Sequence, residues 1–346
     1  MRIVIVGGGL VGTCFALEAS ARGAEVIVVD RTGLHAEAST AGAGILGANA
    51  EALTGDHAAD EGVAAREALM RWVPELEALT KLSARCARRG TLVSATSDDE
   101  FAVYTEWLRA HQSQGVALTG KEAREFEPSL ATPAHGAVLF EDDGSLEPAR
   151  LGSAVTAAVH SAGIRTCCGV AVAAVLMQSG AVTGVRMDDG TAIEGDAVVI
   201  ASGAWSAPLL APLGIADDVL PLRGQLLELR PRTGELRTVL FEGKRYIVPR
   251  GDGRYVVGST MERVGFDRGT TESAYADLMA FASRVVPSFR DSEVLAHWAG
   301  LRPFRAGGPR IGATPIAGLF TSFGHGRNGI LFCRKSAIDL ANAMKL

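Results

Sequence analysis

The sequence predicts an α/β fold in which helices flank a parallel sheet and a second domain of mixed strands is inserted into the first. Three observations predict it. The chain opens on a short apolar strand, a glycine-rich turn and a helix. The same pattern, a strand that ends in a turn of small residues before a helix, recurs near residues 196–206 and 318–330. Between them the pattern changes to short alternating strands, and 346 residues exceed the usual size of one domain.

The chain begins with a strand–helix–strand unit. Residues 2–6 are apolar and mostly β-branched, which is typical of a buried strand in a parallel sheet. Apolar residues recur at helical spacing over residues 10–21, and the Arg-Gly pair at 22–23 predicts the helix end. Residues 26–29 resume as a strand, and Asp30 closes the unit.

Gly7, Gly9 and Gly12 of this unit match the pattern G-x-G-x-x-G. The first glycine makes a tight turn, the second lets backbone approach a pyrophosphate, and the third lets the helix pack on the strand. The phosphates would lie on the helix N-terminus, and Asp30 would accept hydrogen bonds from ribose hydroxyls. The glycines could instead merely serve a helix–strand turn. Because strand, turn, helix, second strand and carboxylate follow one another in the order and spacing of the dinucleotide-binding motif, we favour a Rossmann-type dinucleotide-binding domain. The motif does not distinguish FAD from NAD.

Composition narrows the class of protein. Lys and Arg number 34 against 39 Asp and Glu, a net charge of -5 without a basic run, so nucleic acid is not an expected partner. Five cysteines without a C-x-x-C pair argue against a zinc site or a disulfide scaffold and for a reducing cytosol, and we expect no metal. Because the first strand leaves no room for a cleavable signal and no apolar run is long enough to span a membrane, we expect a cytoplasmic protein.

The next segments continue the first domain. Residues 35–49 are rich in small side chains, which let backbone lie close to a large flat ligand, although helical packing would also explain them. Ser39 and Thr40 offer hydroxyls and a helix N-cap toward a phosphate. A helix is expected over residues 61–84, with Pro74 breaking or restarting it.

Residues 91–143 carry no cofactor motif, and we interpret them as the first part of a second domain inserted into the first. Strands are expected over residues 91–94, 136–140, 164–167, 170–177, 182–187, 219–229, 239–240, 245–249, 255–259 and 318–323. Helices are expected over residues 98–111, 148–163 and 272–286, and a final helix is expected to end at Met344. We place the dinucleotide-binding domain at residues 1–85, 146–218 and 298–346, and the substrate domain at 86–145 and 219–297.

With these pieces placed, the sequence resembles the glycine oxidase branch of the D-amino-acid oxidase flavoproteins over nearly its whole length. Several separated motifs in the same order are far more specific than any one of them. The resemblance rests on Gly7 to Gly12 with Asp30, Ser39 to Ala48, Ala201 to Ser206, Tyr246 to Arg250, Gly258 to Asp267, Trp298 to Pro303 and Gly326 to Ile330.

The resemblance implies FAD, bound without a covalent link. The residues that it places around FAD are Gly7, Gly9, Leu10, Val11, Gly12, Asp30, Arg31, Ser39, Thr40, Ala43, Gly44, Ile45, Val172, Ala201, Gly203, Trp205, Gly300, Arg302, Arg327, Asn328, Gly329 and Ile330.

For the substrate, the resemblance implies that Arg302 binds a carboxylate, with Tyr246 as a hydroxyl partner and Met261 as a wall of the pocket. Arg327 would guard the entrance or pair internally. A bidentate guanidinium suits a carboxylate, although an isolated arginine on a strand could equally form a structural ion pair. His325 and His297 are expected to be structural.

Two departures concern the preferred amino acid. Gly326 stands where the family often has a bulky aromatic residue, and Ile45 or Leu46 stands where it often has methionine. Both would reshape the mouth of the pocket.

The expected reaction is oxidative deamination of glycine or a small D- or N-substituted amino acid by hydride transfer to flavin N5. The imine would hydrolyse to a 2-oxo acid, and molecular oxygen would be reduced to hydrogen peroxide. The alternatives are a dehydrogenase that passes electrons to a quinone or protein acceptor, and a flavin-binding subunit without turnover. Family precedent also implies a homo-oligomer.

Overall fold

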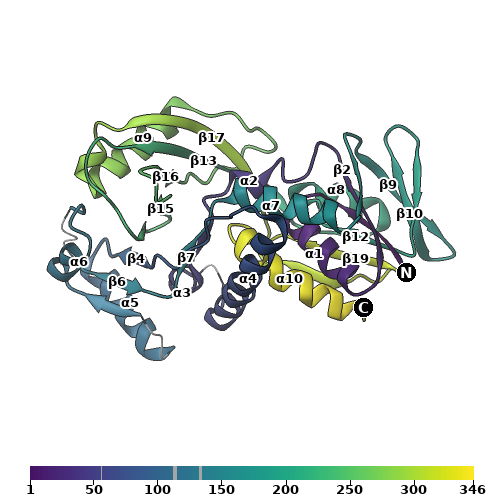
Figure 1. The fold of residues 1–346 in the computed structure, drawn as a ribbon, viewed down its shortest axis with the longest axis horizontal. Coiled ribbons are helices and arrows are strands. Elements are labelled where there is room, and N and C mark those ends of the chain that lie inside the picture. Colours follow the sequence, from purple (N-terminus) through teal and green to yellow (C-terminus); the bar gives the residue numbers. More distant parts are fainter. Residues whose placement is uncertain (56, 112–114, 132–134) are drawn as a thin grey trace.

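The computed structural model describes residues 1–55, 57–111, 115–131 and 135–346. Two large sheets dominate the fold (Figure 1), each with its own helices. The first sheet has six strands in the order β18-β19-β12-β1-β2-β8. All neighbours in it are parallel except the edge pair β18 and β19. Its strands are β1 (Arg2–Val6), β2 (Glu25–Asp30), β8 (Arg165–Cys168), β12 (Ala197–Ile200), β18 (Arg310–Ala313) and β19 (Leu319–Phe323).

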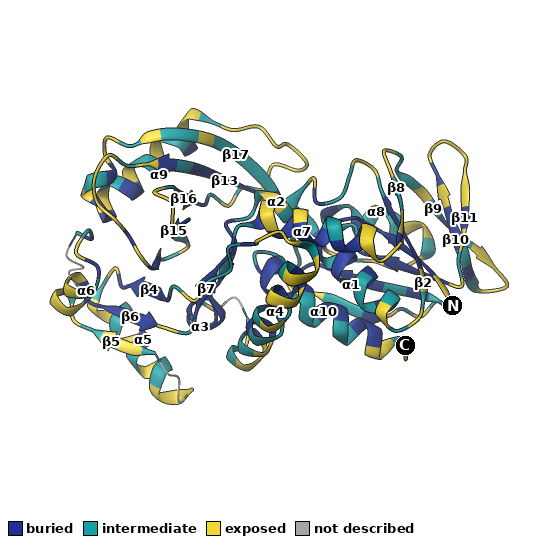
Figure 2. Ribbon diagram, in the orientation of Figure 1, coloured by how far each residue is buried: buried dark blue, intermediate teal, exposed yellow. Residues whose placement is uncertain are grey.

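Strand β1 lies inside the first sheet because its apolar side chains are buried on both faces. Ile3 and Ile5 join a core with the helices of one face, and Val4 and Val6 join a core with the small sheet on the other face. The helices of the first face are α1 (Leu10–Ala21), α4 (Ala59–Thr80), α7 (Pro148–Ser161) and α10 (Gly329–Ala343). The other face carries β9 (Val172–Gln178), β10 (Ala181–Met187), β11 (Ala192–Glu194), α8 (Ser206–Leu210) and η2 (Ala211–Leu213). The short helix η1 (Gly203–Trp205) directly precedes α8. Figure 2 shows the buried strands between these two layers.

The second sheet has eight strands in the order β17-β13-β16-β15-β14-β4-β6-β5. It is mixed, because β14 and β4 run parallel while the other neighbours are antiparallel. Its strands are β4 (Thr91–Ser94), β5 (Val116–Leu118), β6 (Ala137–Phe140), β13 (Leu220–Arg230), β14 (Val239–Glu242), β15 (Arg245–Pro249), β16 (Tyr255–Gly258) and β17 (Glu293–Phe304). Its helices are α5 (Asp98–Ala110), α6 (Gly120–Phe126), α9 (Glu272–Val285) and η3 (Pro287–Phe289).

Short elements lie where the two sheets approach each other: α2 (Ala38–Ala41), β3 (Ile45–Leu46), α3 (Ala48–Leu53) and β7 (Gly144–Ser145). The fold class that the sequence predicts, a Rossmann-type domain with an inserted mixed-sheet domain, is confirmed. The domain boundaries stay a prediction. The predicted boundary at residue 298 falls inside β17. The indole of Trp298, on this strand, donates a hydrogen bond from Nε1 to Ala41 O at 3.0 Å and so contacts the first domain.

The expected break at Pro74 is wrong, because α4 continues through it. Proline removes one helical N–H, and the carbonyl that loses this partner can be hydrated where the helix faces solvent. Pro74 is exposed, while Val73 and Leu76 beside it are buried in the core and hold both halves of the helix against it.

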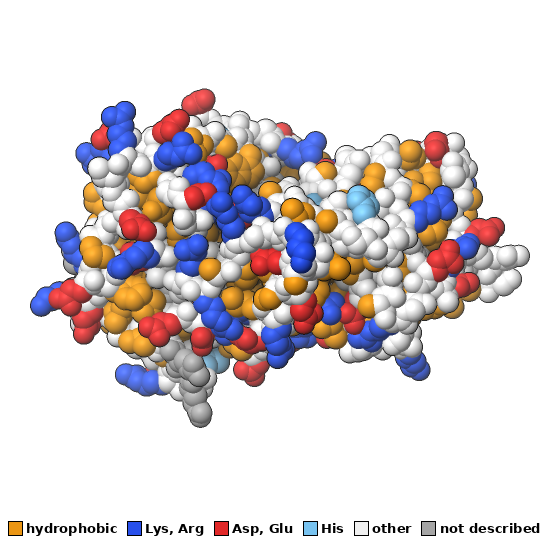
Figure 3. Space-filling view, in the orientation of Figure 1, with side chains coloured by type: hydrophobic (Ala, Val, Ile, Leu, Met, Phe, Trp, Pro, Cys, Tyr) orange, Lys and Arg blue, Asp and Glu red, His pale blue; other side chains and the backbone are white. Residues whose placement is uncertain are grey.

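Acidic and basic side chains are interspersed on the face of the molecule drawn in Figure 3. Within the described ranges, none of the helices is both long and apolar enough to cross a bilayer.

Candidate active site

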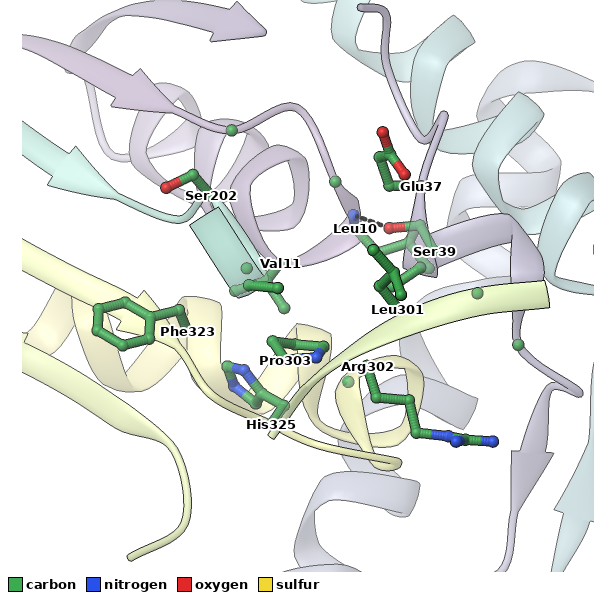
Figure 4. A pocket seen from close by; sticks show the side chains of 18 of the residues that line it. Leu10, Val11, Glu37, Ser39, Ser202, Leu301, Arg302, Pro303, Phe323 and His325 are labelled. Carbon is green, nitrogen blue, oxygen red and sulfur yellow. Dashed lines mark hydrogen bonds between the residues drawn. The ribbon is translucent and has the colours of Figure 1, made fainter. Parts of the chain in front are cut away.

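A cavity of about 370 Å³ lies between the carboxyl ends of β1, β2 and β12 and the strand β17 of the second sheet. Figure 4 shows the start of α1 on one side of it and Arg302 on the other. Residues from both sheets line this one space, because β17 reaches the first domain. Ligands of open parallel sheets bind outside the carboxyl ends of the strands, so this cavity is the candidate site.

The glycine turn brings bare backbone to the cavity. Gly9 is the N-cap of α1, and the N–H of Leu10 donates to Ser39 Oγ at 2.9 Å (Figure 4). A Cβ at Gly7, where φ is +119°, would lie 2.4 Å from the carbonyl oxygen of Ala201. A Cβ at Gly12 would lie 2.0 Å from the carbonyl oxygen of Gly7. The turn therefore cannot take side chains at Gly7 or Gly12, and it presents backbone and a helix N-terminus to a ligand.

Asp30 lies at the end of β2, on the cavity wall, where local hydrogen bonds orient its carboxylate. Its Oδ2 accepts from Gly8 N at 2.8 Å. Its Oδ1 accepts from Thr32 N at 2.8 Å and from Gly33 N at 3.2 Å. Arg31 follows it, with its guanidinium carbon 3.8 Å from the centroid of the Trp205 ring. This arrangement can hold the ribose and base of a dinucleotide.

The small-residue segment is held by Arg250, which directly follows β15 of the second sheet. Arg250 Nη1 donates to Ala43 O at 2.9 Å and to Leu146 O at 3.0 Å. Gly44 has φ +77°, and a Cβ there would lie 2.1 Å from the same Leu146 oxygen. The backbone around Gly44 therefore forms a firm wall of the cavity with little side-chain bulk.

Arg302 and Tyr246 lie at the other end of the cavity. Arg302 Nη1 donates to Thr260 O at 3.1 Å, and Nη2 donates to Ser259 Oγ at 2.6 Å. The guanidinium lies directly over Gly224, where a Cβ would be 2.1 Å from Nη2.

Tyr246 is buried, and its position also depends on a glycine. A Cβ at Gly258, on the neighbouring strand, would lie 2.7 Å from its ring. The glycines of β13 and β16 thus make room for the two side chains that the sequence assigned to the substrate.

Arg327 forms an internal pair, which is one of the two roles expected for it. Its Nη2 lies 3.8 Å from Oε1 of Glu51, and its guanidinium carbon lies 5.8 Å from the centroid of the Tyr246 ring. Both members of the pair line the cavity. Sequence reasoning missed Glu51. The only signal was a single acidic residue in an alanine-rich stretch, and such a residue is usually exposed.

Most of the predicted site residues line this cavity, and a few do not. The ones that line it are Gly7, Gly9, Leu10, Val11, Asp30, Arg31, Ser39, Ala43, Gly44, Ile45, Val172, Ala201, Gly203, Trp205, Tyr246, Gly300, Arg302, Arg327, Gly329 and Ile330. Gly12 lies behind the turn, Asn328 is the N-cap of α10, and Thr40 donates from Oγ1 to His35 O at 3.0 Å.

Met261 does not form a wall of this cavity. Its side chain is 47% exposed and lines a neighbouring surface hollow. The chain is extended here, so successive side chains point to opposite sides. Thr260 Oγ1 accepts from Gln225 N, and Glu262 Oε1 accepts from Gln225 Nε2. Met261, between them, therefore points outward.

His325 also lines the cavity, although the sequence marked it as structural. Its Nε2 lies 2.9 Å from Ser336 Oγ, and burial lowers the pKa of its imidazole to about 4. The imidazole is therefore neutral at neutral pH.

Comparison with known proteins gives consistent results. A sequence model of the DAO family, described as FAD dependent oxidoreductase, matches residues 2–342. The chain is 31% identical over 359 residues to the glycine oxidase of Geobacillus kaustophilus, covering 99% of this chain and 92% of that protein. It is 32% identical to the glycine oxidase of Pseudomonas aeruginosa, covering 99% and 94%. The crystal structure of the glycine oxidase from Geobacillus kaustophilus is similar with a TM-score of 0.94 at 30% identity, covering 99% of this chain and 95% of that one.

Proposed function

The chain belongs to the DAO family of FAD dependent oxidoreductases, and we propose that it oxidises the Cα–N bond of glycine or of a small D- or N-substituted amino acid. Its cofactor is FAD. The observation that carries the proposal is that Arg302 and Tyr246 line the same cavity as the glycine turn of the dinucleotide motif. A carboxylate-binding pair therefore shares one space with a nucleotide-binding turn.

The residues present fit FAD. Gly7, Gly9 and Gly44 leave backbone bare along the cavity, and Asp30 stands at the end of β2 where a ribose would bind. We infer a non-covalent complex. The five cysteines all lie in the described part of the chain and outside the cavity lining, and the lining histidine His325 is paired with Ser336.

The roles of the chain's own residues follow from charge and geometry. Arg302 binds the substrate carboxylate through its planar donor fork, and the bonds to Ser259 and Thr260 hold that fork in one orientation. Tyr246 adds a hydroxyl to the same carboxylate. A substrate held at two points presents one Cα–H in a fixed direction, so positioning supplies much of the rate.

When bound, FAD accepts the hydride that leaves Cα. The amine reacts in its neutral form and loses a proton as the imine forms, so the oxidation needs no side-chain base. Helix α10 begins at Gly329 on the cavity wall, and its positive N-terminal end stabilises negative charge that develops nearby. The imine then hydrolyses to a 2-oxo acid and ammonia, or to a 2-oxo acid and an amine when the substrate is N-substituted, and molecular oxygen takes up the electrons as hydrogen peroxide.

An amino-acid panel tests the proposal. The holoenzyme is mixed anaerobically with glycine, sarcosine and small D-amino acids while the absorbance of the flavin is followed. Rapid bleaching by glycine or its close relatives, followed by oxygen consumption and peroxide formation on admission of air, is expected. Bleaching without oxygen uptake would indicate a dehydrogenase with another acceptor, and the absence of bleaching by every amino acid would reject the proposed substrate class.

A further inference from the structure

Three hydrogen-bond donors converge on the carboxylate of Glu262, which follows β16 in the second domain. Its Oε1 accepts from Gln225 Nε2 at 2.8 Å and from Thr260 Oγ1, and its Oε2 accepts from Arg223 Nη2 at 2.6 Å. We propose that Glu262 is a positioning residue, which holds the guanidinium of Arg302 in the direction that the substrate needs. This role rests on the proposed function, in which Arg302 binds the substrate carboxylate.

Arg302 is connected to the segment that directly follows β16. Its Nη1 donates to Thr260 O at 3.1 Å, and its Nη2 donates to Ser259 Oγ at 2.6 Å. Arg302 interacts with other groups as well. Because these two bonds end on adjacent residues, a shift of this short segment would displace two acceptors of the guanidinium together.

The segment between β16 and Glu262 forms a bulge beside β13. From the Leu226–Gly258 pair to the Arg223–Glu262 bridge, β13 advances by three residues while the opposite segment advances by four. One extra residue on one side is the mark of a β-bulge, which changes the direction of side chains and is common beside active sites. The two acceptors of Arg302 lie in this bulge, where the ladder of backbone hydrogen bonds is disrupted.

Glu262 and its three partners hold the bulge where that ladder does not. Gln225 is fully buried and Arg223 is 4% exposed, so the bonds that they donate to the carboxylate are largely shielded from water. Gln225 N also donates to Thr260 Oγ1 at 2.9 Å, which joins the bulge to β13. Hydrogen bonds to a charged acceptor are strong, particularly away from water. The conformation of residues 259–260 therefore depends on the carboxylate of Glu262.

Hydride transfer depends on direction more strongly than carboxylate binding does. A carboxylate can contact a guanidinium from more than one angle, whereas the Cα–H must point at the atom that accepts the hydride. A misplacement of about 1 Å can slow a reaction about 100-fold. Loss of the Glu262 carboxylate is therefore expected to slow flavin reduction more than it weakens carboxylate binding.

The test uses E262Q, which keeps the shape of the side chain and turns one acceptor into a donor. An amide N–H would then face a donor of Gln225, Thr260 or Arg223. Flavin reduction is followed after anaerobic mixing of the holoenzyme with saturating glycine, and acetate is titrated in a separate experiment while the flavin absorbance is followed. We expect the rate constant of reduction to fall about 10–100-fold, with a smaller change in the Kd of acetate.

A double-mutant cycle shows whether Glu262 acts through Arg302. In R302K the two-point fork is already lost, so E262Q/R302K should reduce its flavin within about twofold of the rate of R302K. Equal slowing by E262Q in both backgrounds would mean that Glu262 does not act through Arg302.

E228Q is the matched control. Glu228 is a partly buried carboxylate on β13 whose Oε1 lies 2.8 Å from Nη1 of Arg254, and it lies outside the described lining of the cavity. E228Q should therefore reduce its flavin at the wild-type rate. Slowing in E228Q as large as that in E262Q would contradict a specific role for Glu262.

Unchanged flavin reduction in E262Q with full FAD content would overturn the inference. Should E262Q lose FAD, T260V decides, because it removes the hydroxyl that joins Glu262 to Gln225 and keeps the carbonyl that accepts from Arg302. T260V should also slow reduction, and a wild-type rate in T260V would overturn the inference as well. Failure of the proposed function is a different result, since no amino acid would then reduce the wild-type flavin.

Discussion

The ring of Phe266 stacks on the indole of Trp205, with centroids 5.1 Å apart and planes inclined by 29°. Trp205 lines the cavity beside Arg31, whereas Phe266 comes from the loop between β16 and α9 of the second domain. A second contact fixes the same loop, because Arg268 Nη1 donates to Glu37 Oε2 at 3.0 Å. The loop therefore contacts two residues, Trp205 and Glu37, that line the cavity.

We expect Phe266→Ala to weaken FAD retention. A stacked aromatic pair contributes about 0.5–1.5 kcal/mol, so FAD should bind roughly 2–10-fold more weakly. The dissociation constant, from fluorescence of FAD during reconstitution of the apoprotein, measures this. Val264→Ala, at an exposed apolar residue of the same loop, is the control and should bind FAD normally. Equal retention by the two variants would mean that the stack contributes nothing to cofactor binding.

Gly9→Val should abolish FAD binding. A Cβ there already lies 3.1 Å from Ser39 Oγ, and the larger side chain would project into the space that the pyrophosphate needs. Gly33→Val is the control, because a Cβ at Gly33 would have no atom of the described part of the chain within 4 Å. FAD content after denaturation is the measurement. Normal flavin content in Gly9→Val would show that the turn is only structural.

Arg302→Ala should lower kcat/KM by a factor that corresponds to a loss of about 2–5 kcal/mol in transition-state stabilisation, because the substrate carboxylate would be left buried and unpaired. The loss should appear for every accepted amino acid, while the flavin spectrum and FAD content stay near wild type. Arg302→Lys should recover only part of the activity, since an ammonium cannot reproduce the two-point fork. Amines without a carboxylate should be poor substrates and much less affected. Normal oxidation of glycine by Arg302→Ala would contradict the substrate class.

His35 should make the fold sensitive to acid. Its side chain is 4% exposed, neither ring nitrogen has a hydrogen-bond partner among the residues that the structure describes, and burial lowers the pKa of the imidazole to about 4. Between pH 6.5 and 4 the unfolded chain binds a proton here that the folded chain does not. The stability is therefore complete above pH 6.5 and falls as the pH falls toward 4, by up to about 3 kcal/mol from this group.

His35→Phe keeps a ring of similar size and removes the titration. The free energy of unfolding, measured from pH 7.5 to 4, should fall less steeply in the variant than in the wild type. The difference between the two curves isolates His35 from the other titrating groups, including Asp143, whose pKa burial raises to about 6. Parallel curves would mean that His35 titrates normally in the folded protein.

The sequence by itself determined the features that depend on neighbouring residues. The turn from Gly7 to Gly12 and the carboxylate of Asp30 are separated by one helix and one strand, so their spacing already implies their geometry. Local periodicity likewise predicted most strands, because burial of alternate or successive apolar residues is visible in the chain. The sequence alone could therefore predict that the glycine turn and Asp30 lie on the wall of one cavity.

Only the tertiary structure decided the features that depend on distant segments. The sequence assigned no role to Glu51 or Phe266, whereas the structure places Glu51 on the cavity wall and stacks Phe266 on Trp205. Pro74 looked like a helix end, yet burial of its neighbours keeps α4 continuous. Sequence patterns report the burial and conformation of one segment, whereas the partner of a side chain is set by how whole segments pack, and no local pattern encodes it.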